Sequence, residues 1–308
     1  MPNHSRSDAP LLNMILYGLT VLIWGTTWIA MTYQVGVVAP ELSVGYRFAI
    51  AAALVFVWAL TTRQRLRFGW RTHGLLAAMG LCMFSFNFYF FYLAAAFLTS
   101  GLLAVVFSMT VVLNIVNGRL FLGRRASPRT LVAAGLGLAG IAALFWPEVE
   151  RFDLADEDTL GLLLSLAGTF CFSLGNIASA RAQMRGLPVL SCNAWGMAYG
   201  ALAMIALALV GGAPFAFDTA LPYVASLLYL ALCGSVIAFG AYLTLLGRIG
   251  ADRAAYATVL FPLVALVIST AVEGYVWTPA ALLGVGLVLA GNLLVLLQPR
   301  SAVPQGAA

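Results

Sequence analysis

The sequence predicts an all-α polytopic membrane protein that crosses the bilayer about ten times. Hydrophobic residues make up 62% of its 308 residues and charged residues only 9%, whereas soluble domains carry about 45–50% apolar and about 25% charged residues. The excess apolar surface must therefore face lipid. The apolar stretches are also long enough, because a helix needs about 20 residues to cross the hydrocarbon core.

Ten apolar stretches reach this length, and short polar connections, several marked by proline, separate them. We expect spanning helices at residues 11–31, 43–61, 74–97, 101–121, 129–146, 160–182, 190–210, 220–246, 253–272 and 279–298. The expected organisation is two five-helix units, residues 11–146 and 160–298, joined by an acidic linker, 147–159, and flanked by polar tails, 1–10 and 299–308.

The arginines orient the chain. All 16 basic residues are arginine, and with the N-terminus in the cytoplasm only Arg47 and Arg151 fall outside the cytoplasmic loops and tails. The linker 147–159 instead holds six acidic residues. Because basic residues collect in cytoplasmic loops, we expect both termini in the cytoplasm and the linker outside. Arg47 is expected about one turn inside the outer end of its span.

The two halves of the chain repeat. The segment GLGLAG that begins at Gly135 matches GLVLAG that begins at Gly286, 151 residues later, and the same offset relates Pro128 to Pro279. Since each half has an odd number of expected spans, the second half must enter the membrane from the opposite side. Inverted repeats are typical of transporters, in which two related halves exchange conformations and open a central site to either side in turn.

Two motifs resemble those of a known family. The segment WGTTW, residues 24–28, is similar to the opening W-G-x-x-(F/W) motif of the drug/metabolite transporter superfamily, specifically its EamA-type ten-helix exporters. The segment FLGRRASP, residues 121–128, resembles the junction of that family's fourth and fifth helices, although Arg124 stands where a Glu is usual. The resemblance covers nearly the whole chain. The aromatic richness points further to the YddG-like aromatic amino-acid exporters.

Polar and aromatic residues form stripes at helical spacing on five of the expected spans. Polar groups inside a bilayer are costly unless they face protein or water, so five stripes favour a shared cavity, although single polar residues often only join helices. The candidate substrate-binding residues are Trp24, Trp28, Ser85, Tyr89, Tyr92, Thr110, Asn114, Thr169, Ser173, Asn176, Trp195 and Tyr242. Trp195 lies near the start of its span and fits the aromatic belt at the membrane surface equally well.

Pro262 lies in the middle of the ninth expected span. Its ring removes a backbone hydrogen bond and can bend the helix, which makes it a candidate gating residue, with a static kink as the alternative. The repeat offset pairs it with Val111, where no break is expected. No Asp or Glu falls in the middle of an expected span, so the cavity would be neutral, and the chain lacks the intramembrane carboxylate that proton or sodium coupling usually needs.

These observations favour an exporter or facilitator of amino acids, including aromatic and neutral ones, and of related metabolites. A multidrug or cationic-toxin exporter of the same superfamily is the alternative, since aromatic rings also bind cations. An intramembrane enzyme is disfavoured because the two histidines, His4 and His73, fall outside the expected spans, where we expect them to be solvated. We expect no cofactor, metal or nucleic-acid partner, and a location in the bacterial inner membrane. The glycine-rich fifth and tenth spans are suited to close packing, within a monomer or in a weak dimer.

Overall fold

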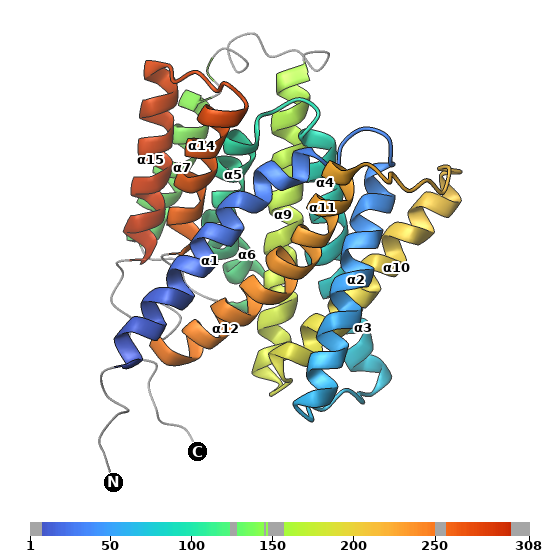
Figure 1. Cartoon of the computed structure of the whole chain (residues 1–308). Coiled ribbons are helices and arrows are strands. Elements are labelled where there is room, and N and C mark those ends of the chain that lie inside the picture. The colour runs from blue at the N-terminus through green and yellow to red at the C-terminus, as the bar shows by residue number, and fades with distance from the viewer. Residues whose placement is uncertain (1–7, 124–127, 145, 147–156, 250–256, 297–308) are drawn as a thin grey trace, which may run out of the picture.

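The computed structural model describes residues 8–123, 128–144, 146, 157–249 and 257–296, and every regular element over these ranges is helical. The elements form one bundle (Figure 1). Two of them, named η1 and η2, are π-helical. In chain order they are α1 (Asp8–Thr32), α2 (Pro40–Thr61), α3 (Trp70–Leu81), η1 (Cys82–Phe86), α4 (Asn87–Ala94), α5 (Ser100–Ser108), α6 (Thr110–Leu122), α7 (Pro128–Leu144), α9 (Glu157–Met184), α10 (Val189–Val210), α11 (Leu221–Tyr229), η2 (Leu230–Ile237), α12 (Ala238–Ile249), α14 (Ala257–Val272) and α15 (Pro279–Leu296).

Seven of the described helical segments are long and apolar enough to cross a membrane. Three further apolar helices, Leu131–Leu144, Leu260–Val272 and Pro279–Leu294, are shorter, and each lies within one of the expected spans. The prediction of an all-helical polytopic membrane protein is therefore confirmed. The count of ten spans stays a prediction.

Proline and glycine mark several helix ends. Pro40 and Pro279 open α2 and α15, because the first turn of a helix needs no amide hydrogen from these positions. Gly123 follows α6 with a φ of 64°, a left-handed conformation that favours glycine at helix ends. Helix α9 starts at Glu157, inside the stretch assigned to the linker, and acidic residues in a first turn are stabilised by the helix dipole.

Two of the long segments contain π-helical turns. Helices α3 and α4 flank η1, and the three form one continuous helical run over residues 70–94. Helices α11 and α12 flank η2 in the same way and form a run over residues 221–249. The repeat offset of 151 residues moves Cys82–Phe86 to residues 233–237, inside η2. A π-turn inserts an extra residue into a helix and is frequent at functional sites.

The expectation of an unbroken fourth span is wrong. Helix α5 ends at Ser108 and α6 begins at Thr110, with Met109 between them at a ψ of −11°. The Ser108 hydroxyl donates to the Val105 carbonyl at 2.6 Å, and the Thr110 hydroxyl donates to its own helix in the same way. Such back-bonding competes with the hydrogen bonds of the helix backbone and bends helices. The break at Met109 lies two residues before Val111, the position that the repeat offset pairs with Pro262.

The most extensive helix contacts join the first half of the chain to the second. Helix α7 packs on α15, α2 on α10, α1 on α14 and α12, and α9 on α3, α4 and α6. Figure 1 shows the α7–α15 pair at one side of the bundle and α2 with α10 at the other. The main hydrophobic core draws on both halves, with Phe48, Phe84 and Tyr92 from the first and Met197 and Met204 from the second. The halves are therefore interlocked.

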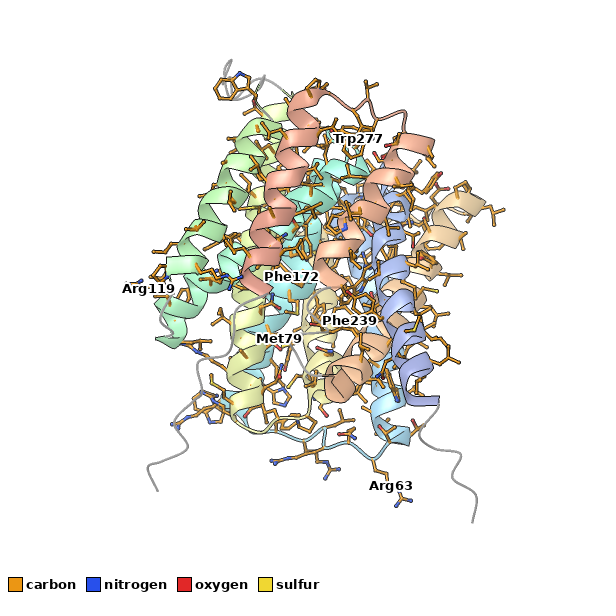
Figure 2. The ribbon with its side chains drawn as sticks, turned by 90° about the vertical axis from the view of Figure 1, so that its left-hand side faces the viewer. Arg63, Met79, Arg119, Phe172, Phe239 and Trp277 are labelled. Atoms are coloured by element: carbon orange, nitrogen blue, oxygen red, sulfur yellow. The ribbon has the colours of Figure 1, made fainter. Side chains whose placement is uncertain are left out.

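Charged residues separate along the bundle. Arg63, which follows α2, lies at the lower end in Figure 2, and Trp277 lies at the upper end. Glu273 is also at the upper end, where its carboxylate accepts hydrogen bonds from the Ser100 amide at 3.1 Å and the Ser100 hydroxyl at 2.6 Å. That contact ties the loop after α14 to the first turn of α5, where a negative charge is favourable.

Candidate functional site

Trp24 is at the contact between α1 and α12. Its ring centroid lies 5.4 Å from that of Phe239 in an edge-on arrangement and 5.2 Å from that of Tyr242. Figure 2 shows Phe239 at mid-height in the bundle, well away from both ends. Two of the candidate residues, Trp24 and Tyr242, are therefore brought together.

Trp28 continues the same face of α1 one turn later. Its ring lies 5.1 Å from Phe91, 5.3 Å from Phe107 and 6.4 Å from Phe261, the last nearly parallel. These rings come from α4, α5 and α14, so that α1 presents its two tryptophans to helices of both halves. Aromatic pairs at these spacings contribute beyond their buried area, and the rings form one central aromatic cluster, defined here as Trp24, Trp28, Phe91, Phe107, Phe239, Tyr242 and Phe261.

Gly25 lies between the two tryptophans in sequence and allows α14 to approach α1. A Cβ atom on Gly25 would lie 2.6 Å from Val264 and 3.2 Å from the Phe261 carbonyl oxygen. The glycine of the WGTTW segment is therefore a packing requirement. It places α1 directly against the part of α14 that contains the buried Pro262.

The amide-bearing stripes of α6 and α9 face each other. The Asn117 amide donates to the Ser173 hydroxyl at 2.9 Å, and the Asn176 amide donates to the Asn114 carbonyl oxygen at 3.3 Å. The candidates Asn114, Ser173 and Asn176 therefore have hydrogen-bond partners across the helix pair, the partner of Ser173 being Asn117, which is outside the candidate set. The Asn117 side-chain oxygen is buried without a hydrogen-bond partner.

The remaining hydroxyl candidates divide into two groups. Thr110 donates to the Phe107 carbonyl at 2.6 Å and Thr169 to the Ser165 carbonyl at 2.7 Å, so both are satisfied within their own helices. Ser85 and Tyr92 are fully buried, and their hydroxyl oxygens have no hydrogen-bond partner. Tyr89 is partly buried, with its ring 6.0 Å from Phe90.

Trp195 belongs to a separate cluster at the lower end of the bundle. Its ring lies 5.1 Å from Phe56 and 4.7 Å from His73, and its indole donates to the Leu66 carbonyl at 3.0 Å. The expectation that His73 is simply solvated is wrong, because its Nδ1 also shares a 2.9 Å hydrogen bond with the Tyr199 hydroxyl. Helix α3 starts at Trp70, four residues earlier than expected, and carries His73 into this contact. His4 is outside the described residues.

Arg47 is a central residue that the candidate set omits. Only 4% of it is exposed, and its guanidinium lies 4.3 Å from the centre of the Phe88 ring and 5.1 Å from that of Phe48. Its Nε donates to the Ser235 hydroxyl over a long 3.4 Å. Helix α2 begins at Pro40, which puts Arg47 about 10 Å, or two turns, inside that end. The sequence signal was present, since a lone charge within a span marks a functional site by default.

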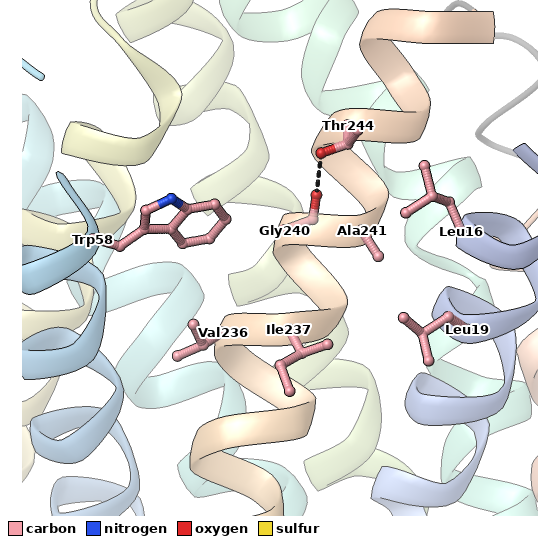
Figure 3. A pocket seen from close by; sticks show the side chains of 8 residues that line it. All are labelled: Leu16, Leu19, Trp58, Val236, Ile237, Gly240, Ala241 and Thr244. Carbon is pink, nitrogen blue, oxygen red and sulfur yellow. Dashed lines mark hydrogen bonds between the residues drawn. The ribbon is translucent and has the colours of Figure 1, made fainter. Parts of the chain in front are cut away.

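A crevice of about 360 Å³ opens sideways between α1, α2 and the η2–α12 run. Figure 3 shows its apolar lining, in which the one hydroxyl, on Thr244, is satisfied by the Gly240 carbonyl at 2.8 Å. None of the candidate residues lines it. The lining residues are Leu16, Leu19, Trp58, Val236, Ile237, Gly240, Ala241 and Thr244. Because Leu19, Trp58 and Ile237 are exposed, the crevice is open at the outer surface of the bundle.

Two further expectations, on metal binding and on the glycine-rich helices, can be compared with the described residues. Within them, no three His, Cys, Asp or Glu side chains gather to hold a metal ion. The glycine faces of α7 and α15 meet within the chain, since a Cβ on Gly140 would lie 2.7 Å from the Gly284 carbonyl and one on Gly284 would lie 2.6 Å from the Gly140 carbonyl.

A model of the EamA-like transporter family matches residues 12–146 and matches again over residues 159–297. The chain belongs to the EamA-like transporter family. This membership confirms the resemblance seen in the sequence motifs. With its apolar spans, it makes the chain a multi-pass membrane transporter and not an enzyme.

Relatives of this EamA-like transporter align over nearly its whole length. Protein PagO of Salmonella typhimurium is 26% identical, covering 89% of this chain and 90% of that protein. The probable amino-acid metabolite efflux pump of Escherichia coli K12 is 25% identical over 93% and 94%. The uncharacterized inner membrane transporter YedA of the same strain is 28% identical over 90% and 88%. A crystal structure with 21% identity superposes at a TM-score of 0.63 over 94% of this chain and 97% of its own, which shows a shared fold.

Proposed function

We propose that this transporter exports amino acids, including aromatic and neutral ones, and related small metabolites, by alternating access. The observation that carries the proposal is the central aromatic cluster, where Trp24 and Trp28 meet rings of both halves. Aromatic faces bind ring-bearing and apolar solutes by stacking and burial. The relative named as a probable amino-acid metabolite efflux pump supports the same class of solute.

The cluster and the polar candidates around it would form one binding region. The Asn114–Asn176 pair offers amide donors and acceptors, and the unpartnered hydroxyl of Ser85 is available for a solute. Trp195 would act at the cytoplasmic mouth, since it belongs to the cluster at the lower end. Such a region would bind a neutral or zwitterionic solute through hydrogen bonds and ring contacts.

Alternating access needs two related halves, and we propose ten spans in two inverted five-helix repeats, residues 11–146 and 160–298. The family model matches each half separately. The π-turns η1 and η2 also occupy corresponding positions. The packing supports the same relation, because α1 contacts α12 and α14 of the second half as α9 contacts α3, α4 and α6 of the first.

We propose that the lower end of the bundle in Figure 1 faces the cytoplasm. The described part of the chain starts with α1 and ends with α15 at that end, together with the arginine-rich connection after α2, as the preference for basic cytoplasmic loops requires. The tails 1–10 and 299–308 would then be cytoplasmic and the linker 147–159 external. The relative YedA, named as an inner membrane transporter, supports a location in the bacterial inner membrane.

Transport would be downhill, with no fixed proton or sodium stoichiometry. Of the described acidic residues, four lie in the first turn of a helix and two in connections: Asp8, Glu41, Glu157, Asp158, Asp218 and Glu273. Intramembrane carboxylates are the usual carriers of coupling. An imposed pH or sodium gradient should therefore leave the rate of transport unchanged and cause no net accumulation of solute. Uphill accumulation under either gradient would contradict this part of the proposal.

A flux panel tests the proposal. Purified full-length protein is reconstituted into liposomes, and the liposomes are loaded with phenylalanine, tryptophan, leucine or the lipophilic cation tetraphenylphosphonium. The rate of solute release is then compared with that from protein-free liposomes loaded in the same way. We expect saturable release of the amino acids. Release of the cation with no release of any amino acid would favour the alternative, a multidrug or cationic-toxin exporter of the same superfamily.

A further inference from the structure

Arg47 is a buried cation, and no negative charge among the described residues neutralises it. Its 4% exposure excludes bulk water, and no carboxylate of the described residues forms an ion pair with it. Among the described residues, its neighbours are the aromatic faces of Phe48 and Phe88, the Tyr92 phenol and, over a long hydrogen bond, Ser235, all of them uncharged groups. Buried charges are normally paired with an opposite charge, so this guanidinium is suited to an anion that the described residues do not provide.

The structure leaves room for the guanidinium at a backbone irregularity. A Cβ on Gly234 would lie 3.6 Å from the Nη2 atom of Arg47 and 2.8 Å from Thr27 of α1. Gly234 is in the π-turn η2, in which the Ser235 hydroxyl bonds the Leu230 carbonyl five residues earlier at 3.0 Å. The glycine therefore lets α1 approach η2 closely at Thr27, and the Arg47 guanidinium lies beside this contact.

A second unsatisfied group is close to the first. The Tyr92 hydroxyl is fully buried beside the Arg47 side chain, with which it interacts electrostatically, and no hydrogen bond of regular geometry satisfies it. A phenol can donate one hydrogen bond, and a guanidinium offers a fork of N–H donors that matches the two oxygens of a carboxylate. The two donor groups come from neighbouring helices, Arg47 from α2 and Tyr92 from α4.

Ring contacts connect this anion site to the central aromatic cluster. Phe48, beneath the guanidinium, lies 5.4 Å from Phe84, Phe84 lies 6.2 Å from Phe239, and Phe239 lies 5.4 Å from Trp24. Thr27, which is next to Gly234, is also the residue before Trp28. A continuous series of ring contacts therefore joins the surroundings of Arg47 to the central aromatic cluster.

We propose that Arg47 binds the carboxylate of the transported solute, with Tyr92 as a second donor, while the solute's side chain packs on the central aromatic cluster. This inference rests on the proposed function and narrows its substrate class to monocarboxylates, amino acids included. Permanent cations lacking a carboxylate would be repelled at this position. Ser235 orients the guanidinium from the side.

Binding to the purified full-length protein in detergent tests the inference without requiring transport. The probes are 3-phenylpropionate and 3-phenylpropanamide, which share ring and chain length but differ in charge, measured by calorimetry. We expect the acid to bind about 10- to 100-fold more tightly than the amide, the range for hydrogen bonds to a charged group. Arg47→Gln should abolish this preference, whereas Arg71→Gln, at an exposed arginine of α3, should leave it unchanged.

Two results would contradict the assignment of Arg47. Equal binding of acid and amide by the unchanged protein, or a preference that survives in Arg47→Gln, would overturn the inference. If Arg47→Gln does not fold, Arg47→Lys decides, because an ammonium keeps the charge but lacks the two-pronged geometry: a reduced preference supports the inference, and an undiminished one overturns it.

Flux measurements separate this inference from the proposed function. If amino acids cross the membrane but Arg47→Gln releases phenylalanine as fast as the unchanged protein, the inference fails and the proposed function stands. If no amino acid is released while an Arg47-dependent preference for 3-phenylpropionate persists, the proposed function fails and the carboxylate site stands.

Discussion

Replacing Gly25 by alanine tests the contact on which the aromatic arrangement depends. The added Cβ would lie 2.6 Å from two carbon atoms of Val264, whereas carbon atoms prefer separations of about 3.5–4.0 Å. Helices α1 and α14 would have to separate by about 1 Å. Overpacking of this kind costs about 1–3 kcal/mol, from which the gain of about 0.5–1 kcal/mol for alanine over glycine within a helix is subtracted.

We therefore expect Gly25→Ala to destabilise the transporter by up to about 2.5 kcal/mol and to slow flux, because Trp28 and Phe261 would move apart. Thermal unfolding of the purified protein in detergent measures the first effect and liposome flux the second. Gly18→Ala is the matched control, since it lies on the same helix with nothing within 4 Å of its added Cβ. It should be neutral or stabilising.

A double-mutant cycle makes the reasoning sharper. Val264→Gly removes the atoms that clash, so the two substitutions should be coupled and the double variant should lose less stability than the sum of the single ones. If Gly25→Ala is as stable as Gly18→Ala, or if the cycle shows no coupling, α1 and α14 do not meet as described, and the explanation of the WGTTW glycine fails.

Three further predictions follow. In a background lacking the four native cysteines, a cysteine at Arg65 should react with an impermeant reagent only from the cytoplasm and one at Asp156 only from outside; labelling of the Arg65 position from outside would contradict the orientation. Trp24→Ala should lower flux about tenfold or more, in keeping with truncation of a buried aromatic contact, whereas Leu138→Ala, 62% exposed on α7, should not; equal flux in both would place the site elsewhere. Pro262→Ala should slow flux more than it weakens substrate binding, as expected of a gating residue; a parallel loss of both would indicate a static kink.

The sequence predicts the helices of this protein well because the bilayer imposes one simple requirement on length and hydropathy. Every expected span contains a described helix, and prolines and glycines mark several of the ends. What hydropathy does not encode is backbone detail inside a span. The π-turns and the break at Met109 depend on local hydrogen-bond geometry, which different apolar sequences can adopt.

The site was harder to predict because helical periodicity gives the face of a residue but not its partners. Trp24 and Tyr242 do meet, yet Trp195 has the same aromatic character and lies in the cluster with His73. Arg47 was omitted because its predicted helix began three residues late, which made it look close to the surface. Its burial results from α2, α4 and η2 packing together, and no one of these segments predicts it alone.

The interlocking of the two halves has a consequence for how the chain is made. Helix α7 ends at residue 144, whereas its partner α15 ends at residue 296. At a synthesis rate of about 5–20 residues per second, α7 must wait roughly 8–30 s in the membrane before its contact with α15 is complete. During that interval the backbone near Gly140 has no native partner surface, and Arg47 lacks Ser235 until η2 is made. Membrane chaperones and proteases therefore have their longest access to this protein while only its first half has been made.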